Sequence, residues 1–298
     1  MWESYKTEFG KQYPTMQEEN TRFGIFMNNL AVIDQRNAAE AAVGGDAVHG
    51  INKFTDISQE EFTTRYLLSD VSFKSGKKAA VAQVKPLPEG VDALVDWTGT
   101  YTTPVKDQGY CGSCWAFSAT EQIESDCMRV SGETPILSPE QITQCDSTSY
   151  GCNGGWSENA YDYVQSAGGM ASESDYPYTS SSGTTGTCMS SLPSLSCAIT
   201  GYKTISSESA MAAYVESTGP LSVCLDANSF NSYTSGIMSV CGTSVDHCVQ
   251  AVGVDTASGY WKVRNSWGTS WGESGFIRLA YGANTCDITN DPTYVTMA

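Results

Sequence analysis

The sequence predicts an α+β fold, and three stretches of the chain support this class. Residues 1–40 carry an amphipathic helical pattern, and mostly helical signals run from residue 97 to about 190. From about residue 198 onward, short apolar runs alternate with turns rich in Gly, Asn and Ser, which is typical of strands. At 298 residues the chain is long enough for a sizeable core and for more than one domain.

Cysteine content sets this chain apart from an ordinary cytosolic protein. The apolar fraction of 40% is usual for a globular chain, but 11 cysteines indicate an oxidising route, and their odd number leaves at least one thiol unpaired. The start of the chain shows no signal-peptide pattern, so we expect that any such signal has been removed or replaced. No apolar run approaches membrane-spanning length.

The net charge of −17 is unevenly distributed along the chain. Residues 1–90 carry 10 basic and 12 acidic side chains, a net charge of −2, and residues 91–298 carry 6 and 21, a net charge of −15. Such an acidic C-terminal body repels nucleic acid and anionic membranes, so neither is expected as a partner. The charge suits work in an acidic compartment, and solubility alone is the alternative reading.

The N-terminal region reads as a helix followed by a linker. An apolar stripe at helical spacing ends at Ile33, with no proline after Pro14. Residues 72–90 have little apolar content and two prolines, which is typical of a linker. We interpret His49, between these regions, as a surface residue, with a pH-sensing role as the alternative.

The region from 97 to 190 predicts three helices and one glycine-rich loop. The first helix starts near Cys114, the second is capped by Ser138 before Pro139, and the third runs near residues 158–166. The loop at 150–155 contains Gly154 and Gly155, which leave room for another backbone, although a plain turn is the alternative. The predicted strands beyond this region are residues 221–225, 249–254, 260–263 and 276–279.

Cys114 is the first candidate for chemistry. The start of a helix presents unpaired N–H groups and the positive end of the helix dipole, and both lower the pKa of a thiol. The pair Cys111-x-x-Cys114 also permits a redox dithiol or half of a zinc site. A zinc site is disfavoured because the chain has only two histidines, so no metal and no cofactor are expected.

Two further segments supply groups that a thiolate nucleophile requires. His247 is the only histidine after residue 49 and opens a predicted strand, although a lone histidine is more often structural. In the segment Asn265-Ser266-Trp267-Gly268, the amide of Asn265 can accept a hydrogen bond from an imidazole nitrogen and fix its tautomer. Trp267 can shield that bond from water.

These residues together resemble a known family. The segment Gln108-x5-Cys114-Trp115-Ala116-Phe117-Ser118 resembles the nucleophile segment of papain-family cysteine proteases, and Asp246-His247 and Asn265-Ser266-Trp267 resemble the other two catalytic segments. Two patterns near the N-terminus are similar to inhibitory pro-segments of cathepsin L-like members: Glu18, Arg22, Phe26, Asn29, Ile33 and Asn37, followed by Gly50-x-Asn52-x-Phe54-x-Asp56. The resemblance spans the chain from Glu18 to Asp291.

The resemblance implies a papain-like two-domain fold with a helical left domain, a β-barrel-like right domain and a cleft between them. It implies an inhibitory pro-domain at residues 1–71, a linker with the activation cleavage region at 72–92, and a peptidase domain at 93–298. Residues 95–97 resemble the start of a mature enzyme in this family. We expect Leu67 to Asp70 to lie across the cleft.

In catalytic terms the resemblance implies the zymogen of a cysteine endopeptidase. Cys114 is the nucleophile, His247 its proton partner in a thiolate–imidazolium pair, and Asn265 the residue that orients the imidazole. Gln108 and the N–H of Cys114 form the oxyanion hole, and hydrolysis passes through a thioester. Autoactivation at acid pH is expected, because protonation of a paired Asp56 loosens the pro-segment.

The resemblance also implies a substrate-binding set. It comprises Asn153, Gly154, Gly155, Trp156, Cys224, Val245, Asp246, Cys248, Trp267 and Asp291. The glycine-rich loop binds extended substrate as an added strand. Asp291 is placed at the floor of the main specificity pocket, where it admits Arg or Lys by charge pairing; a solvent-facing Asp291 is the alternative.

Family spacing implies three structural disulfides, Cys111–Cys152, Cys145–Cys188 and Cys241–Cys286. Cys224 and Cys248 occupy positions that carry small pocket-lining residues in relatives. A bridge between these two and two free thiols remain equal alternatives, and Cys127 and Cys197 can also pair.

The implied partners are protein or peptide substrates, the chain's own pro-segment as inhibitor, and cystatin-like inhibitors. A monomer located in a lysosome or vacuole, or secreted, is expected. Two alternatives come from other classes. A thiol-disulfide oxidoreductase would leave His247 and Asn265 unexplained, and a catalytically silent binding or storage homologue would leave the complete catalytic set unexplained.

Overall fold

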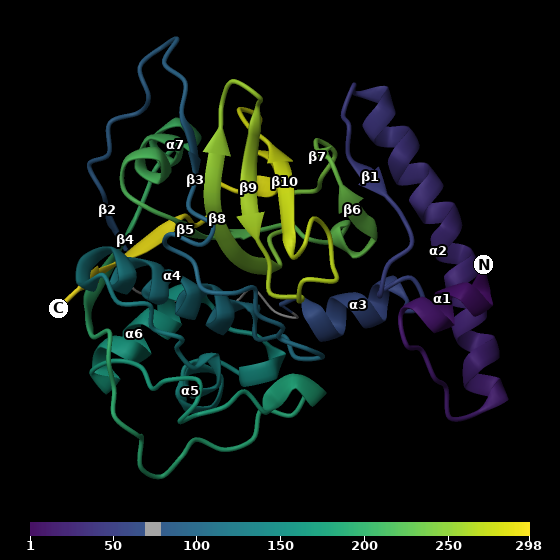
Figure 1. Ribbon diagram of the computed structural model, residues 1–298, viewed down its shortest axis with the longest axis horizontal. Coiled ribbons are helices and arrows are strands. Elements are labelled where there is room, and N and C mark those ends of the chain that lie inside the picture. The colour runs from purple at the N-terminus through teal and green to yellow at the C-terminus, as the bar shows by residue number, and fades with distance from the viewer. Residues whose placement is uncertain (69–78) are drawn as a thin grey trace.

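The computed structural model describes residues 1–68 and 79–298. We call residues 1–68 the N-terminal segment and residues 79–298 the body. Figure 1 shows the helices of the segment along one side of the body, with the strands and helices of the body in two neighbouring regions. The predicted boundary between residues 71 and 72, and with it Ser69 and Asp70, lies outside the described residues.

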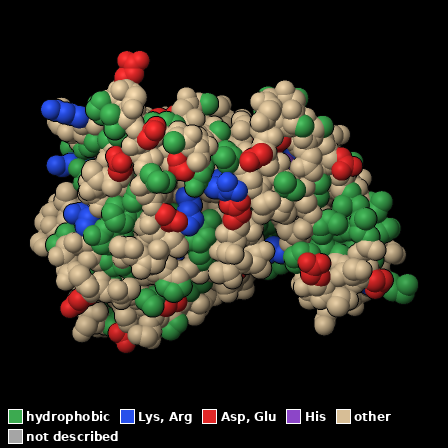
Figure 2. All heavy atoms as spheres, turned by 45° about the horizontal axis from the view of Figure 1, so that its top comes forward, with side chains coloured by type: hydrophobic (Ala, Val, Ile, Leu, Met, Phe, Trp, Pro, Cys, Tyr) green, Lys and Arg blue, Asp and Glu red, His purple; other side chains and the backbone are tan. Residues whose placement is uncertain are grey.

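The N-terminal segment contains helices α1 (Trp2–Glu8), α2 (Met16–Ala42) and α3 (Gln59–Tyr66) and the short strand β1 (Val48–His49). Thr15 and Ser58 cap α2 and α3 by accepting hydrogen bonds from the N–H groups of Glu18 and Glu61. The stripe predicted over residues 1–40 is thus divided between two helices, and Pro14 lies in the break. Figure 2 shows hydrophobic side chains gathered at this end of the molecule, where Met16 is among the exposed ones.

The first region of the body is helical. It contains α4 (Cys114–Ser131), α5 (Pro139–Cys145), α6 (Ser157–Ala167), η1 (Gly151–Asn153) and η2 (Ser180–Ser182). Ser138 accepts a hydrogen bond from the N–H of Gln141, as the predicted cap requires. Gly132 and Gly168 end α4 and α6 in the left-handed conformation, where glycine has no steric cost.

The second region contains a nine-stranded sheet. Its strand order is β2-β4-β11-β5-β8-β9-β10-β7, and β3 also pairs with β8. The bounds are β2 (Ala80–Val81), β3 (Leu94–Asp96), β4 (Ile199–Thr204), β5 (Leu221–Leu225), β7 (Ile237–Met238), β8 (His247–Asp255), β9 (Tyr260–Arg264), β10 (Phe276–Ala280) and β11 (Thr293–Met297). Strand β6 (Tyr233–Ser235) pairs with β1 of the N-terminal segment instead. Helix α7 (Glu208–Ser217) and the short helices η3 (Phe230–Ser232) and η4 (Thr285–Asp287) complete the region.

Part of the predicted linker belongs to this sheet. Ala80 and Val81 pair in parallel with Lys203 and Thr204 of β4. The low apolar content of residues 72–90 is compatible with this pairing, because a short edge strand is held by backbone hydrogen bonds and buries few side chains.

The two regions of the body meet along α4. Ser118 of α4 donates to the carbonyl of Val249 in β8 and contacts Ser222 of β5. The fully buried Arg264 of β9 forms an ion pair with Glu121 of α4 at 3.4 Å. These contacts fix the start of α4 relative to the start of β8.

Five disulfides tie the body together. They are Cys111–Cys152, Cys127–Cys197, Cys145–Cys188, Cys224–Cys248 and Cys241–Cys286. The bridge between Cys224 and Cys248 and the bridge between Cys127 and Cys197 are therefore both present. Cys114 is the cysteine that remains free. No helix within residues 1–68 and 79–298 combines the length and apolar character needed to cross a membrane.

Candidate active site

Cys114 is the first residue of α4 and is fully buried. The preceding turn is fixed by Tyr178, whose hydroxyl donates to the carbonyl of Gln108 and contacts the hydroxyl of Ser113 at 2.9 Å in each case. Gly112 permits this turn, because a Cβ there would lie 2.6 Å from the carbonyl oxygen of Cys152. These contacts fix the turn that leads into the first residue of the helix.

Burial determines the protonation of this thiol in the present state. It raises the pKa of Cys114 to about 12, and the backbone N–H groups of Cys248, Trp115 and Cys114 itself oppose the shift. The helix start therefore acts in the predicted direction, but desolvation is the larger effect while the N-terminal segment covers the site. The prediction of a thiolate therefore applies to the state in which the N-terminal segment has left and water reaches Cys114.

His247, the first residue of β8, is oriented by Asn265. Its Nε2 lies 2.8 Å from Oδ1 of Asn265, and its Nδ1 has no hydrogen-bond partner among the described residues. The ring of Trp267 stacks on the imidazole with centroids 4.7 Å apart. Burial lowers the pKa of His247 to about 4. With Nε2–H donated to Asn265, the free Nδ1 is the nitrogen able to exchange a proton with a thiol.

The structure brings the two candidate catalytic groups to one place. The N–H of Cys248, the residue after His247, acts on the sulfur of Cys114, and Cys114 and Cys248 belong to one buried apolar cluster. The start of α4 and the start of β8 therefore meet, although they come from different regions of the body and are separated by more than a hundred residues.

Gln108 lies beside this pair with its amide directed at the N-terminal segment. Its Nε2 donates to the carbonyls of Tyr66, at 3.1 Å, and Cys111, at 2.8 Å. Its Oε1 accepts a hydrogen bond from the hydroxyl of Ser266 at 2.6 Å, which fixes the amide orientation. A carbonyl of the segment therefore occupies the donor that was predicted for an oxyanion.

The end of the N-terminal segment lies across the site, as expected for its described residues. The N–H of Leu68 donates to the carbonyl of Asp246 at 2.7 Å, and the Leu67 carbonyl passes close to Gly112. The aromatic rings of Phe54, Phe62 and Tyr66 pack edge-on against Trp267. Backbone and rings together exclude water from His247 and Cys114.

The glycine-rich loop lies on the helical side of the site. Asn153 is exposed at the end of η1, and Gly154 and Gly155 follow it. A Cβ on Gly155 would lie 2.5 Å from the ring of Trp115, so this position requires glycine to stay close to α4. The loop therefore lies directly against the helix that begins at Cys114.

Four of the ten predicted substrate-binding residues lie in or against the apolar cluster of Cys114. Trp156, Cys224 and Cys248 belong to it, Val245 packs against it, and Leu68 of the segment is part of it. Asp291 is 4% exposed, and one of its carboxylate oxygens accepts a hydrogen bond from the indole of Trp156 at 2.6 Å. The solvent-facing alternative for Asp291 is therefore wrong.

Two polar residues near the site were not found from the sequence. Asp246 is held by the N–H of Ala227, at 2.8 Å, and by the side-chain amide of Asn228, which in turn contacts Asp226. Burial raises the pKa of Asp246 to about 7. Asp226 and Asn228 lie in a turn without a motif, so only the folded chain reveals that they hold the residue before His247.

Asp56 is the central anchor inside the N-terminal segment. Its carboxylate accepts hydrogen bonds from the hydroxyls of Tyr5 and Tyr13 and forms an ion pair with Lys11 at 2.7 Å. The expectation for His49 is wrong in one respect: His49 is 3% exposed and lies at the contact with the body. It is buried because β1, on which it lies, pairs with β6.

No group of three or more His, Cys, Asp or Glu side chains in the described part of the chain has a metal-binding arrangement.

Comparisons with known proteins agree with this geometry. Residues 87–296 match the family described as papain family cysteine protease, and residues 2–62 match the cathepsin propeptide inhibitor domain. The chain is 38% identical to digestive cysteine proteinase 1 of Homarus americanus, over 99% of this chain and 94% of the relative.

Two solved structures extend the likeness to the N-terminal segment. The digestive procathepsin L2 proteinase from Tenebrio molitor larval midgut is 32% identical, with a TM-score of 0.86 over 99% of this chain and 98% of that chain. The recombinant stem bromelain precursor is 34% identical, with a TM-score of 0.83 over 99% and 97%. Both similarities cover the segment and the body together.

Proposed function

The chain belongs to the papain family of cysteine proteases and is the zymogen of a cysteine endopeptidase, and we propose which residues perform the hydrolysis and how acid releases them. In this proposal Cys114 is the nucleophile, His247 the acid and base, Asn265 the orienting residue, and Gln108 an oxyanion donor. The N-terminal segment is the inhibitory pro-segment, and we use that name for it from here on.

The acylation step follows from the free Nδ1 of His247. Once the pro-segment has left, water and the N–H groups at the start of α4 stabilise the Cys114 thiolate, and His247 holds the proton. The sulfur attacks the peptide carbonyl carbon and forms a C–S bond, while the carbonyl oxygen becomes an oxyanion held by the Gln108 amide and the Cys114 N–H. The C–N bond then breaks, and Nδ1 of His247 gives its proton to the leaving amine.

Deacylation uses the same groups in reverse. Neutral His247 takes a proton from a water molecule, whose oxygen attacks the thioester carbon. The C–S bond breaks, the peptide acid leaves, and the thiolate–imidazolium pair returns. Asn265 holds Nε2–H throughout, so that Nδ1 always faces the sulfur, and Trp267 keeps water from that hydrogen bond.

One observation carries this proposal. The backbone of Tyr66 to Leu68 binds the Gln108 amide through a carbonyl and the Asp246 carbonyl through an N–H. An extended peptide offers the same carbonyl and N–H groups, so the pro-segment occupies the groups that would bind a substrate. In this proposal the glycine-rich loop at 153–155 binds the other edge of the extended substrate.

Acid release is the second part of the proposal. Protonation of Asp56 would remove the charge that Lys11 and the hydroxyls of Tyr5 and Tyr13 now hold, and this weakens the fold of the pro-segment. Cleavage in the region 71–92 then frees the peptidase domain. A lysosomal, vacuolar or secreted enzyme is supported by five disulfides and by the acidic body. Cystatin-like inhibitors and a monomeric state complete the proposal.

Active-site titration tests both parts. An epoxysuccinyl reagent is added to the zymogen at pH values from 7 to 4, and the labelled residue is identified by peptide mapping. We expect no labelling at neutral pH, and stoichiometric labelling of Cys114 after acid activation. Failure of the acid-treated chain to label would favour a silent binding or storage homologue. Labelling of Cys111, or insulin reduction, would favour an oxidoreductase.

A further inference from the structure

One disulfide of the body lies at the cleft, unlike its counterpart between Cys127 and Cys197. Cys224 of β5 and Cys248 of β8 are direct register partners, with Cα atoms 4.0 Å apart. Both are fully buried, and Cys248 is adjacent to His247 in the chain. The bond therefore connects two strands at the point where β8 contributes its catalytic residue.

The pro-segment shows which part of a substrate meets this bond. Leu68 is 3% exposed, its N–H is bound to the Asp246 carbonyl, and its side chain belongs to the cluster that contains Trp156, Cys224 and Cys248. A substrate bound in place of the pro-segment puts one of its own side chains where Leu68 now lies. Both cysteines belong to the same buried apolar cluster as Leu68.

We propose that the Cys224–Cys248 disulfide is a specificity-determining element, which limits the size of the substrate side chain that replaces Leu68. The inference rests on the proposed function. Two unbonded side chains can change rotamer to admit a larger group, whereas two bonded sulfur atoms are fixed by both strands at once. A rigid disulfide excludes an oversized side chain by steric overlap, and this overlap weakens binding more than a missing contact does.

The pair of variants C224A/C248A and C127A/C197A tests this role against simple stabilisation. Each removes one disulfide of the body, but only the first removes two buried members of the cluster that contains Leu68, whereas Cys197 is a partly buried residue packed against that cluster. We measure kcat/KM for two peptides that carry either Phe or Val two residues before the scissile bond, with active sites titrated first. The Phe-to-Val ratio should rise about tenfold in C224A/C248A and stay at the wild-type value in C127A/C197A.

A second variant, in which one cysteine is replaced by the larger Val, gives the same test if C224A/C248A folds poorly. C224A/C248V restores volume without a covalent bond, and its Phe-to-Val ratio should lie between those of the wild type and C224A/C248A. An unchanged ratio in titrated, active enzyme would overturn the inference, as would an equal rise in C127A/C197A. Loss of thiol labelling in the wild type would instead count against the proposed function.

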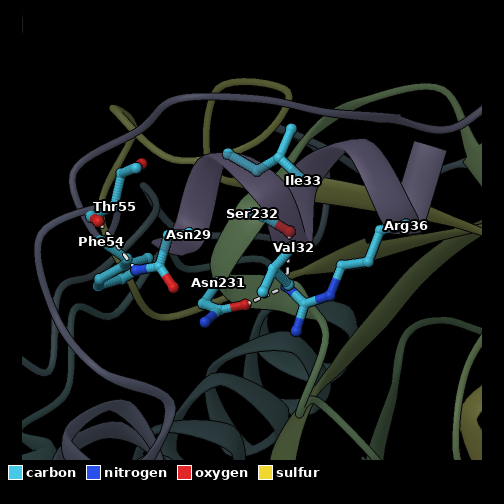
Figure 3. A pocket seen from close by; sticks show the side chains of 8 residues that line it. All are labelled: Asn29, Val32, Ile33, Arg36, Phe54, Thr55, Asn231 and Ser232. Carbon is cyan, nitrogen blue, oxygen red and sulfur yellow. Dashed lines mark hydrogen bonds between the residues drawn. The ribbon is translucent and has the colours of Figure 1, made fainter. Parts of the chain in front are cut away.

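A second inference comes from the contact between α2 and the body. Arg36 of α2 enters the body and donates to the side-chain oxygens of Asn231, at 2.5 Å, and Ser232, at 2.6 Å. Figure 3 shows this side chain pointing from the helix toward both residues. Its other partners among the described residues are the carbonyls of Ser229 and Asn228 and the amide oxygen of Gln59, so neutral oxygens surround the cation. Burial lowers the pKa of Arg36 to about 10, which still leaves it charged at neutral and acid pH.

His49 shares the Ser232 hydroxyl with this cation. Its Nδ1 lies 2.9 Å from the Ser232 Oγ, and its backbone is held on both sides by the side chain of Asn37. Because a hydroxyl has two lone pairs and one proton, Oγ can accept from Arg36 and at the same time donate to the Nδ1 of a neutral His49. A protonated Nδ1 would donate to Oγ instead, and protonated His49 would place a second positive charge beside Arg36 in a buried contact.

The other charged groups at this contact do not relieve that repulsion. Glu40 accepts hydrogen bonds from the N–H groups of Ser239 and Val240, and Asp46 accepts from the N–H of Ile237. Burial, and after it the charge of Arg36, lowers the pKa of His49 to about 4. The residues of β6 and η3 that lie next to His49 are Tyr233 and Ser232, and both are uncharged.

We infer that His49, Arg36 and Ser232 form a pH-sensitive latch that holds the pro-segment on the body while His49 is neutral. A released His49 has the usual pKa of about 6.5. Attachment is therefore full above about pH 6.5, and weakens by up to tenfold for each pH unit down to about 4, as the released form binds the proton more tightly. This latch is separate from Asp56, which lies inside the pro-segment.

Autoactivation of the full-length zymogen across pH tests the latch. In H49N, which offers a neutral acceptor at every pH, the half-activation point should move down by about one pH unit. H49K and H49M form a matched pair of similar length, one charged and one not. H49K should activate at neutral pH, and H49M should not. Equal behaviour of H49K and H49M, or an unchanged midpoint in H49N, would overturn the latch, and thiol labelling after activation monitors the catalytic site independently.

Discussion

The pro-segment and the body are held together by different interactions. All 11 cysteines lie beyond residue 110, and five disulfides stabilise the body. The described pro-segment has no disulfide, and its polar anchors are titratable or charged groups, among them Asp56, His49 and Arg36. A fall in pH leaves covalent bonds intact, whereas it can neutralise a carboxylate or charge an imidazole.

This difference explains how acid can remove the inhibitor without harming the enzyme. The apolar contacts of Phe54, Phe62 and Tyr66 with Trp267 do not titrate, so their contribution to pro-segment binding does not change with pH. Release therefore depends on the polar anchors, while the body keeps its shape through its disulfides. The predictions below test this division, from the largest expected effect to the smallest.

Replacement of Cys114 by Ser should abolish catalysis without changing the stability of the body or the attachment of the pro-segment. We expect turnover to fall by at least about 10⁴-fold, because a serine hydroxyl beside His247 is a far weaker nucleophile than a thiolate. The melting temperature and the acid release of the pro-segment should stay unchanged, since the exchange replaces only one buried sulfur atom. Peptidase assays and thermal melts check this, and retained activity would show that another residue is the nucleophile.

Removal of the Cys127–Cys197 disulfide should weaken the body alone. These residues are 70 positions apart, so C127A/C197A should lower the free energy of unfolding of the mature enzyme by about 2–4 kcal/mol. The pH midpoint of autoactivation should not move, because no anchor of the pro-segment touches this bond. Denaturant melts measure the free energy of unfolding, and activation profiles measure the pH midpoint. A shifted midpoint would show that this disulfide also affects the attachment of the pro-segment.

Replacement of Asp56 by Asn should weaken the pro-segment alone. The variant loses the ion pair with Lys11 and the charge that the hydroxyls of Tyr5 and Tyr13 now bind, which is worth about 1.5–3 kcal/mol. The zymogen should therefore activate at a higher pH and about 10- to 100-fold faster.

A matched control for Asp56 lies on the surface of the body. Asp96 forms an ion pair with Lys262 at 2.7 Å, and its side chain is half exposed. D96N should leave the activation profile unchanged, because exposed pairs contribute at most about 1 kcal/mol and this one lies outside the pro-segment. If D56N and D96N gave the same profile, Asp56 would not be an anchor.

The sequence predicted the elements whose patterns are local. The helix that begins at Cys114 and the cap at Ser138 follow from short motifs, and the strands around Val249 and Ile277 follow from apolar runs. Helix α7 was not predicted, because it lies among strand-like runs where a short helix gives a weak signal. Strand β2 was missed because its stability comes from pairing with β4, which its own residues do not show.

The candidate site divides in the same way. Gln108, Cys114, His247 and Asn265 stand in motifs with specific spacing, and the resemblance assigned their roles. Asn228 and Ser232 lie in turns without such a motif, and their importance depends on partners 18 to 196 positions away. The burial of His49 likewise depends on β6, so local reading placed it on the surface.

Replacement of Asp291 should give the smallest of these effects, confined to substrate choice within the body. Its carboxylate lies buried against the Trp156 indole, and we propose that it pairs with an Arg or Lys side chain of a substrate. D291N keeps an acceptor for the indole and removes the charge, so kcat/KM for a peptide with Arg two residues before the scissile bond should fall about tenfold. The kcat/KM for the Phe peptide should stay within about twofold, since an uncharged phenyl ring forms no ion pair with Asp291.

D291A also removes the hydrogen-bond acceptor of the Trp156 indole. If that hydrogen bond supports the pocket, kcat/KM should fall for both peptides in D291A. Equal loss on both peptides in D291N would exclude charge pairing as the basis of a preference for basic side chains.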